Sequence, residues 1–305
     1  MTDLVIADLY PGLLRTYGDR DNVVVLARRA EWRGFSVRIE EVGPGEPIPT
    51  DTNVVVLGGG TDSVQQIVGR DVVWRAEEIR DAVAGGAVVL GVCGGYQLLG
   101  RRYILPDGRE IQGLGILDVE TRASRDRIVG RVQADARLWG RSFDLVGFEN
   151  HGGRTTLGPG AEALASIRRG HGNNGHDRME GASQGSVVGT YLHGPVLALN
   201  PELTDSMLAR ALARLTGGAE LDPLDDAIER RAHEGLAQRV RDDRRPARRH
   251  RVIAAAIAAI ILLGAMASFM AVERHEGNTV KGWFESGWMD LAQAGHLISP
   301  PLRFT

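Results

Sequence analysis

The sequence predicts an α/β fold in which a mainly parallel sheet is covered by helices on both faces, followed by one hydrophobic helix near the C-terminus. Short apolar runs alternate with longer amphipathic stretches over the first 200 residues, a pattern typical of strand–helix units. The run "AVVLGVC" at 87–93 is apolar throughout, which indicates a strand buried on both faces. Residues 252–272 carry no charged side chain, which indicates the separate helix.

The elements follow in chain order. "NVVVLARRAEWRG" predicts a strand that runs into a helix, and "TNVVVLGGG" predicts a strand that stops at three glycines. "DVVWRAEEIRDAVAGG" has apolar residues near helical spacing and ends in a glycine pair, which indicates a helix C-terminus. Strands or hairpin arms are predicted for "GLGILDVETRA", "RIVGRVQA" and "SFDLVGFENH", and one strand ending at a glycine for "SVVGTYLHG". "NPELTDSMLARALARLTGG" predicts a closing helix with Asn200 as N-cap and Pro201 at the first helical position.

Composition excludes several classes of function. With 305 residues, 43% of them hydrophobic and 25% charged, the chain is expected to bury one sizeable core. The single cysteine permits no intramolecular disulfide, which fits a reducing compartment such as the cytosol. A net charge of -3 argues against nucleic acid as a partner, and the N-terminus does not have the pattern of a signal peptide. Lys281 is the only lysine and lies in no P-loop motif, which argues against a nucleotide site of that kind.

The C-terminal part has a different composition. Residues 231–251 are rich in arginine and predict a linker. At about 1.5 Å per residue, a helix over residues 252–272 would be roughly 30 Å long, the thickness of a bilayer core. The arginines precede it, which predicts a transmembrane helix whose N-terminal side stays in the cytoplasm. A buried Ala-rich helix is the alternative. The predicted organisation is therefore an α/β domain over 1–230, the linker over 231–251, a membrane helix over 252–272 and a short tail over 273–305.

The only cysteine, Cys93, follows an apolar run and precedes a predicted helix. Gly91 and Gly95 flank it two positions away on each side, the pattern G-x-nucleophile-x-G of a nucleophile elbow. Glycines leave room for the tight turn, and the free N–H groups at the start of the helix favour the thiolate. A small buried cysteine in a Gly-rich turn is the alternative.

Two further features point to the same edge of the predicted sheet. The strand "VVVLGGGTD" ends in glycines, and ligands of parallel sheets bind beyond the carboxyl ends of the strands. N–H groups of Gly59 or Gly60, together with that of Gly94, could form an oxyanion hole; a flexible loop is the alternative. His193 in "VVGTYLHGP" is the favoured general base and His151 in "FENHGGRT" the second choice. A lone histidine at a strand end is more often structural.

Taken together, these motifs resemble the class I, triad-type glutamine amidotransferases. "GVCGGYQLLG" and "GTYLHGPVLALNPEL" carry the resemblance to the class. "GGGTD", "FENHGGRT", "GNNG", "EGA" and "TYLHGP" follow in the order of its cobyric-acid-synthase-like branch, and most of all of the glutaminase subunits of lipid II isoglutaminyl synthases. The similarity covers about residues 3–225. It implies a flavodoxin/Rossmann-like, three-layer fold.

The resemblance also implies an activity and a partner. Cys93 would attack the carboxamide carbon of L-glutamine and His193 would relay protons. Arg127 in "RDRIVG" would hold the substrate by bidentate pairing with its carboxylate; a solvated arginine is the alternative. The ammonia would pass to a separate subunit similar to Mur ligases. That subunit would use ATP and Mg to amidate the D-glutamate of lipid II in peptidoglycan synthesis, so no cofactor and no metal is expected in this chain.

There are two departures from the family pattern. Many class I enzymes carry Glu two residues after the catalytic histidine, where this chain has Pro195. The third member of the triad must then come from elsewhere, or a Cys–His dyad remains, which is chemically adequate for a thiolate. The hydrophobic C-terminal segment is the second departure. Three alternatives stay open: a glutaminase for another amidation such as that of a cobyric acid-type synthase, an unrelated cysteine hydrolase, and a silent membrane-anchoring subunit. Retention of both Cys93 and His193 argues against the last.

Overall fold

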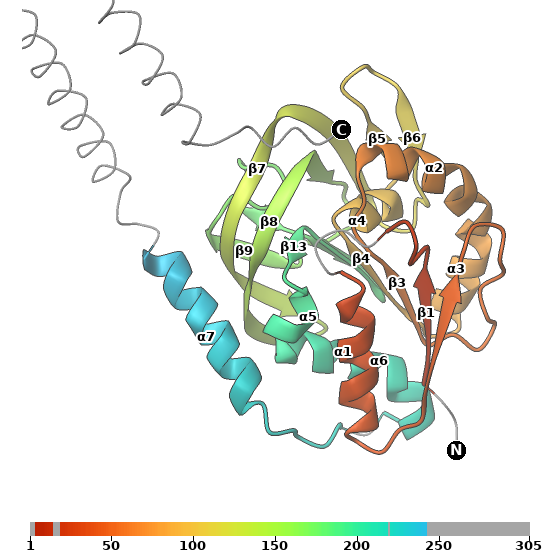
Figure 1. Cartoon of the computed structure of the whole chain (residues 1–305), viewed down its shortest axis with the longest axis vertical. Helices are drawn as coiled ribbons and strands as arrows, with labels where there is room; N and C mark the ends of the chain where they lie inside the picture. Colours follow the sequence, from red (N-terminus) through yellow and green to blue (C-terminus); the bar gives the residue numbers. More distant parts are fainter. Residues whose placement is uncertain (1–3, 15–18, 219, 243–305) are drawn as a thin grey trace, which may run out of the picture. The chain divides into compact units, whose positions relative to one another are not determined.

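The central sheet of the computed structural model has six strands in the order β11-β12-β4-β3-β1-β2 (Figure 1). The structure describes residues 4–14, 19–218 and 220–242. The strands are β1 (Leu4–Leu9), β2 (Val37–Val42), β3 (Val54–Leu57), β4 (Val88–Val92), β11 (Ala182–Gln184) and β12 (Val187–Thr190). All neighbours pair in parallel except β11, which runs antiparallel to β12. The predicted α/β fold with a mainly parallel sheet is confirmed.

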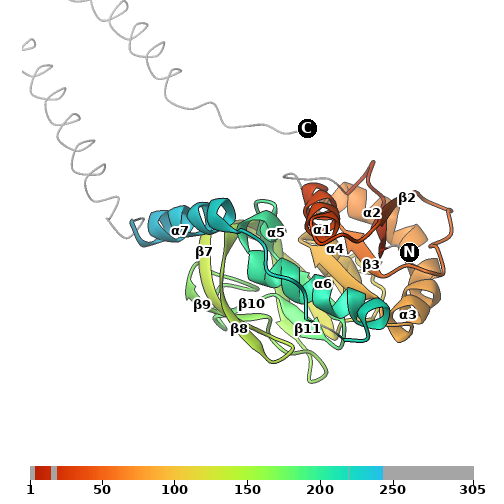
Figure 2. The same cartoon turned by 90° about the horizontal axis from the view of Figure 1, so that it is seen from below.

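Helices cover both faces of this sheet. The helices of the described residues are α1 (Asp21–Glu31), α2 (Asp62–Val72), η1 (Val73–Arg75), α3 (Ala76–Ala84), α4 (Gly94–Leu99), α5 (Val196–Leu199), α6 (Pro201–Thr216) and α7 (Ala227–Asp242). The last of them, α7, packs instead against a second sheet. The crossover from β1 to β2 and the one from β3 to β4 run in opposite directions, and right-handed crossovers then put α1 and α2 on opposite faces. In agreement, α1 contacts α5 and α6, whereas α2 contacts α4 (Figures 1 and 2). Every residue of β1, β3 and β4 is buried, as the run at 87–93 predicts.

A second sheet of seven strands lies next to the first and is mostly antiparallel. Its strands are β5 (Arg102–Ile104), β6 (Glu110–Gln112), β7 (Val119–Leu138), β8 (Arg141–Leu157), β9 (Ala165–Arg169), β10 (Met179–Glu180) and β13 (Leu192–His193). The long hairpin β7–β8 turns at Trp139 and Gly140, both at positive φ. The predicted hairpin arms are confirmed, but their assembly into a separate sheet was not predicted.

Two predicted strands differ from the structure. The predicted strand in "NVVVLARRAEWRG" is wrong, because α1 begins at Asp21 and includes the valine run. Val23, Leu26 and Ala30 lie at helical spacing and are at most 1% exposed, so burial of one helix face outweighs the β propensity of valine. The single strand predicted over "SVVGTYLHG" is divided at Tyr191 into β12 and β13, which belong to different sheets.

The closing helix α6 is confirmed, with Pro201 in its first turn and Gly217 in the left-handed conformation at its end. The Asn200 side chain does not cap it. Its amide instead exchanges two hydrogen bonds with the backbone of Val146 on β8. Helix α7 continues to Asp242, through the first part of the predicted linker, and His233 donates to the Leu199 carbonyl oxygen over 2.9 Å.

Within the described residues, none of the helices combines the length and the apolar character needed to cross a membrane. The rest of the predicted linker, the predicted membrane helix over 252–272 and the tail over 273–305 lie outside those residues.

Candidate active site

Cys93 lies at a strained turn between β4 and α4. Its φ of 51° is in the left-handed region, which costs a residue other than glycine about 1–3 kcal/mol and occurs mostly at functional sites. The turn is too tight for side chains nearby. A Cβ at Gly91 would lie 2.5 Å from Leu99 Cδ1, and one at Gly95 would lie 2.2 Å from the Leu57 carbonyl oxygen. The predicted elbow geometry is confirmed.

His193 connects Cys93 to a buried carboxylate. Its Nδ1 lies 2.9 Å from Oδ1 of Asp19, and both side chains are at most 1% exposed. Cys93 lies close to the same ring: a Cβ at Gly59 would be 3.3 Å from His193 Cε1 and 3.5 Å from Cys93 Cβ, and the cysteine interacts favourably with the imidazole. Because Nδ1–H donates to the carboxylate, Nε2 is the nitrogen left to face the sulfur. The line Cys93–His193–Asp19 has the connectivity of a nucleophile, a base and an orienting acid.

The environment of His193 favours its charged form. Burial alone would lower the pKa of His193, but the hydrogen bonds to Asp19 and Cys93 outweigh it and raise this pKa to about 10. An imidazolium beside the sulfur stabilises a thiolate by charge and can later supply a proton to a leaving amine.

Asp19 was not identified from the sequence. It lies in the segment between β1 and α1, and β1 is the neighbour of β3 in the sheet. Asn22 holds the segment by donating to the Asp19 carbonyl oxygen over 3.0 Å. One signal in the sequence could have pointed to Asp19. The apolar run "LVIADL" at 4–9 indicates a strand, and an acidic residue in the segment after a parallel strand can lie at the carboxyl edge of the sheet, where ligands bind. Asp19 is therefore the candidate for the third member of a triad, at a position far in the chain from Pro195.

The glycines after β3 have different environments. The N–H of Gly59 donates to Asp19 Oδ2 over 2.9 Å, so it orients the carboxylate and is not available to an oxyanion. A Cβ on Gly94 would lie 2.7 Å from the backbone nitrogen of Gly60, which brings these two residues together beside the cysteine. Gly60 and Gly94 therefore remain the candidates for the oxyanion hole.

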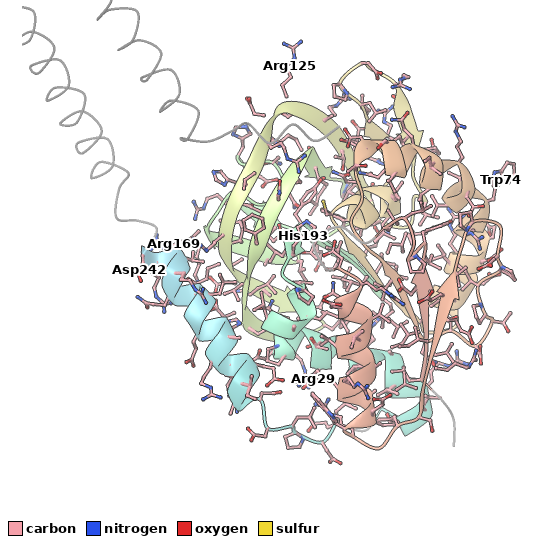
Figure 3. All side chains as sticks on the ribbon, viewed as in Figure 1. Arg29, Trp74, Arg125, Arg169, His193 and Asp242 are labelled. Atoms are coloured by element: carbon pink, nitrogen blue, oxygen red, sulfur yellow. The ribbon has the colours of Figure 1, made fainter. Side chains whose placement is uncertain are left out.

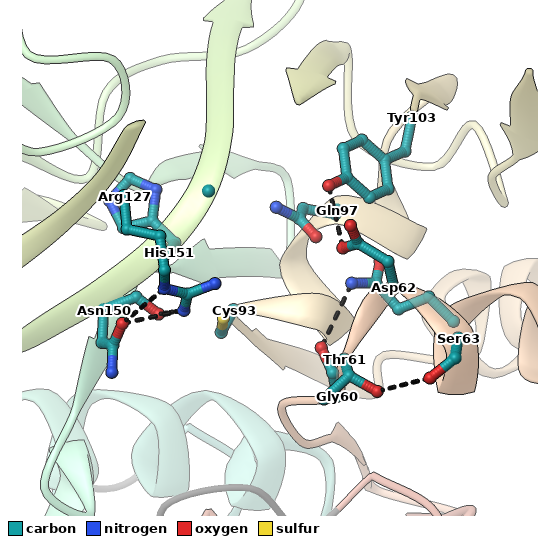
Figure 4. A pocket seen from close by; sticks show the side chains of 12 residues that line it. Gly60, Thr61, Asp62, Ser63, Cys93, Gln97, Tyr103, Arg127, Asn150 and His151 are labelled. Atoms are coloured by element: carbon teal, nitrogen blue, oxygen red, sulfur yellow. Dashed lines mark hydrogen bonds between the residues drawn. The ribbon is translucent and has the colours of Figure 1, made fainter. Parts of the chain in front are cut away.

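A pocket of about 330 Å³ opens beside Cys93, and Arg127 is one of the residues that line it (Figure 4). Asn150 fixes the guanidinium: Arg127 Nε and Nη2 donate to Asn150 Oδ1 over 3.0 and 2.8 Å, and Nη2 also donates to the Asn150 carbonyl oxygen. The arginine is therefore not a freely solvated side chain. A guanidinium in the pocket that Cys93 also lines suits the carboxylate of a small amino acid.

His151 also lines this pocket but is held differently from His193. Its Nδ1 contacts the Gly153 carbonyl oxygen over 2.8 Å, and its ring stacks on Tyr191 at a centroid distance of 3.6 Å. Burial lowers the pKa of His151 to about 3. The ring is therefore neutral at pH 7, and among the described residues Nδ1 is used to donate to a backbone carbonyl, which makes His151 a poor proton relay.

This arrangement defines a class of protein: enzymes that cleave an amide through a cysteine nucleophile on an α/β sheet. The chain belongs to the CobB/CobQ-like glutamine amidotransferase domain family, whose model matches residues 5–201. It is therefore a glutamine-hydrolysing enzyme.

Two relatives that share a function resemble the chain over most of their length, and a third does so over about a third of its length. It is 36% identical over 240 residues to the GatD subunit of the glutamine-hydrolysing lipid II isoglutaminyl synthase of Staphylococcus aureus, covering 78% of this chain and 97% of that one. The corresponding GatD subunit of Streptococcus pneumoniae is 35% identical, with 70% and 82% covered. Cobyric acid synthase of Brucella abortus is 36% identical, but only 32% of its length is matched.

Proposed function

We propose that the chain is the glutaminase subunit of a lipid II isoglutaminyl synthase. The observation that supports it best is the arrangement of Cys93 next to His193, with His193 hydrogen-bonded to Asp19, beside a pocket that Cys93 and Arg127 both line. Similarity to GatD subunits over 97% of the length of one of them supports the choice of lipid II over other amidation substrates.

In the proposed mechanism, the Cys93 sulfur attacks the carboxamide carbon of L-glutamine and forms a tetrahedral intermediate. N–H groups of Gly60 and Gly94 stabilise its oxyanion. His193 donates its Nε2 proton to the amide nitrogen, the C–N bond breaks, and ammonia leaves behind a thioester on Cys93. His193 then takes a proton from water, whose oxygen attacks the thioester, and glutamate and the free sulfur result. Arg127 holds the α-carboxylate throughout.

The ammonia is consumed by a second subunit in this proposal. A synthetase similar to Mur ligases activates the D-glutamate carboxylate of lipid II with ATP and Mg, and ammonia displaces the phosphate. No ATP or metal chemistry is assigned to this chain.

Glutamate release from L-glutamine by the purified chain, with and without a Mur-ligase-like partner and lipid II, tests the function. We expect glutamate in both cases and amidated lipid II only with the partner, ATP and Mg. Glutamate release with cobyrinic acid-type acceptors amidated instead of lipid II would assign another synthase, and no glutamate under any condition would contradict a glutaminase.

Arg127→Ala is expected to raise the KM for glutamine by about tenfold to 100-fold, because a bidentate ion pair to the substrate is lost. The rate at which iodoacetamide alkylates Cys93 should stay unchanged, since Arg127 binds substrate and does not activate the sulfur. Arg125→Ala is the matched control, because Arg125 lies on the same strand and points away from the molecule (Figure 3). A normal KM in Arg127→Ala would show that this arginine does not bind the substrate.

We also propose that residues 252–272 anchor the catalytic domain to the cytoplasmic membrane, where lipid II resides. The support is the sequence alone: 21 uncharged residues after an Arg-rich segment. The full chain should remain with membranes in high salt, because salt does not weaken burial of apolar side chains but does screen arginines on anionic lipid. A version ending near residue 245 should be released and still hydrolyse glutamine. Full-length chain in the supernatant without detergent would contradict anchoring.

A further inference from the structure

The motifs "GNNG" and "EGA" have no part in the mechanism above, yet both adjoin the segment that carries His193. That segment leaves the six-stranded sheet at Thr190 and enters the seven-stranded sheet at Leu192, with Tyr191 between the two. The Cys93 N–H donates to the Thr190 carbonyl oxygen over 2.8 Å, so the start of this crossing is tied to the nucleophile. The base lies at its other end (Figure 3).

A single buried carboxylate, that of Glu180 in "EGA", organises the crossing. Its Oε1 accepts a hydrogen bond from the Thr190 hydroxyl over 2.6 Å and another from the Tyr191 N–H over 2.9 Å. The Thr190 hydroxyl in turn accepts from the Leu192 N–H over 3.0 Å. All three residues of the crossing are thus connected to Glu180, directly or through one hydroxyl.

Tyr191, in the middle of the crossing, is also tied to the nucleophile helix. Gln97 on α4 donates to the Tyr191 hydroxyl over 3.0 Å, and the hydroxyl lies 2.6 Å from Thr155 Oγ1. Asn173 in "GNNG" accepts from the Tyr96 hydroxyl over 3.2 Å and donates to the carbonyl oxygen of Gly181, the residue after Glu180. These bonds connect α4, the helix that follows Cys93, with Tyr191 in the crossing. Through Asn173 they also connect α4 with the backbone next to Glu180.

Burial of the Glu180 carboxyl group is unfavourable, which indicates that its hydrogen bonds have a role in the structure. The residue is 0% exposed, and burial raises its pKa to about 7 in spite of the two hydrogen bonds. A buried carboxyl group destabilises a fold unless its partners compensate, and an apolar residue would fill the same space at lower cost.

We propose that Glu180 is a positioning residue: it fixes the crossing at 190–192 so that His193 faces Cys93. The inference rests on the proposed glutaminase function for the role of His193. It predicts that loss of the acceptor at position 180 impairs the reaction of the cysteine, whereas loss of the charge alone does not.

The test compares Glu180→Gln, which keeps an oxygen acceptor for both hydrogen bonds, with Glu180→Ala, which removes it. Glu180→Gln should keep kcat within about threefold, and Glu180→Ala should lose at least about tenfold, because a displacement near 1 Å can cost about 100-fold in rate. The KM for glutamine should stay within about twofold in both, since Arg127 and Asn150 lie on β7 and β8. Alkylation of Cys93 at pH 7, which needs no glutamine, should slow only in Glu180→Ala.

Thr190→Val and Thr190→Ser keep the proposal testable if Glu180→Ala does not fold. Valine has nearly the shape of threonine but lacks the hydroxyl, so kcat and alkylation should fall; serine should restore both. Thr204→Val is the control, because Thr204 is equally buried and its hydroxyl donates to the carbonyl oxygens of Leu197 in α5 and of Asn200, not to residues 190–192. Folded Glu180→Ala and Thr190→Val proteins with wild-type kcat and alkylation, and a lowered Tm alone as in the control, would overturn the proposal. A wild-type chain that releases no glutamate would instead refute the proposed function.

Discussion

Replacing Cys93 by alanine is expected to abolish glutamate release from glutamine while leaving the fold intact. The reaction needs the sulfur as a covalent nucleophile, and removal of a nucleophile costs several orders of magnitude in kcat. The side chain is small and only 8% exposed, so its loss removes little packing. Glutamate release and thermal unfolding of Cys93→Ala and Cys93→Ser, measured beside the wild type, check the expectation.

Residual activity needs its own control, because traces of another glutaminase can mimic it. Since Cys93 is the only cysteine, iodoacetamide should inactivate the wild-type enzyme with incorporation of one label per chain. It should incorporate none into Cys93→Ala. A folded Cys93→Ala protein that hydrolyses glutamine at the wild-type rate would mean that the cysteine is a buried bystander.

The next largest losses are expected for His193→Ala and Asp19→Asn, about 100-fold to 10,000-fold in kcat, the range typical of general acid–base groups and their orienting partners. His193 moves the proton, and the Asp19 carboxylate selects the tautomer that presents Nε2 to the sulfur. His151→Ala should lose much less, because a ring whose pKa is about 3 stays uncharged at neutral pH and is too weak a base to take up the proton. Steady-state kinetics of the three variants make the comparison.

The pKa of His193 gives an independent measurement. Because Asp19 and Cys93 raise it to about 10, the imidazole should stay protonated through the neutral range and lose its proton only as the pH rises toward 10. In Asp19→Asn one of these contributions is gone, so the titration should move to lower pH, as followed by NMR of the ring. An unchanged titration, or a greater loss of activity in His151→Ala than in His193→Ala, would mean that the base is assigned wrongly.

Local signals predicted the elbow at Cys93, the closing helix α6 and the buried strands β3 and β4. In each case a few consecutive residues suffice: glycines two positions either side of a turn, Pro201 and Gly217 at helix ends, or an apolar run of strand length. The valine run in α1 shows where such signals fail. The β propensity of its valines favours a strand, whereas the spacing of its apolar residues favours a helix. The segment is a helix because one of its faces is buried against the rest of the fold.

The sequence by itself therefore determined the class of fold, the candidate nucleophile and the candidate base, because these depend on short motifs and on the order of strands and helices. Only the tertiary structure showed that Asp19, separated from His193 by 174 positions in the chain, is the acid that orients it. It also showed that the Gly59 N–H is used for this carboxylate and that Glu180 supports the crossing to His193. These contacts depend on β1 lying next to β3 and on the chain changing sheets at Tyr191. Hydrophobic periodicity reports which face of an element is buried, but contains no information on which distant loop meets it.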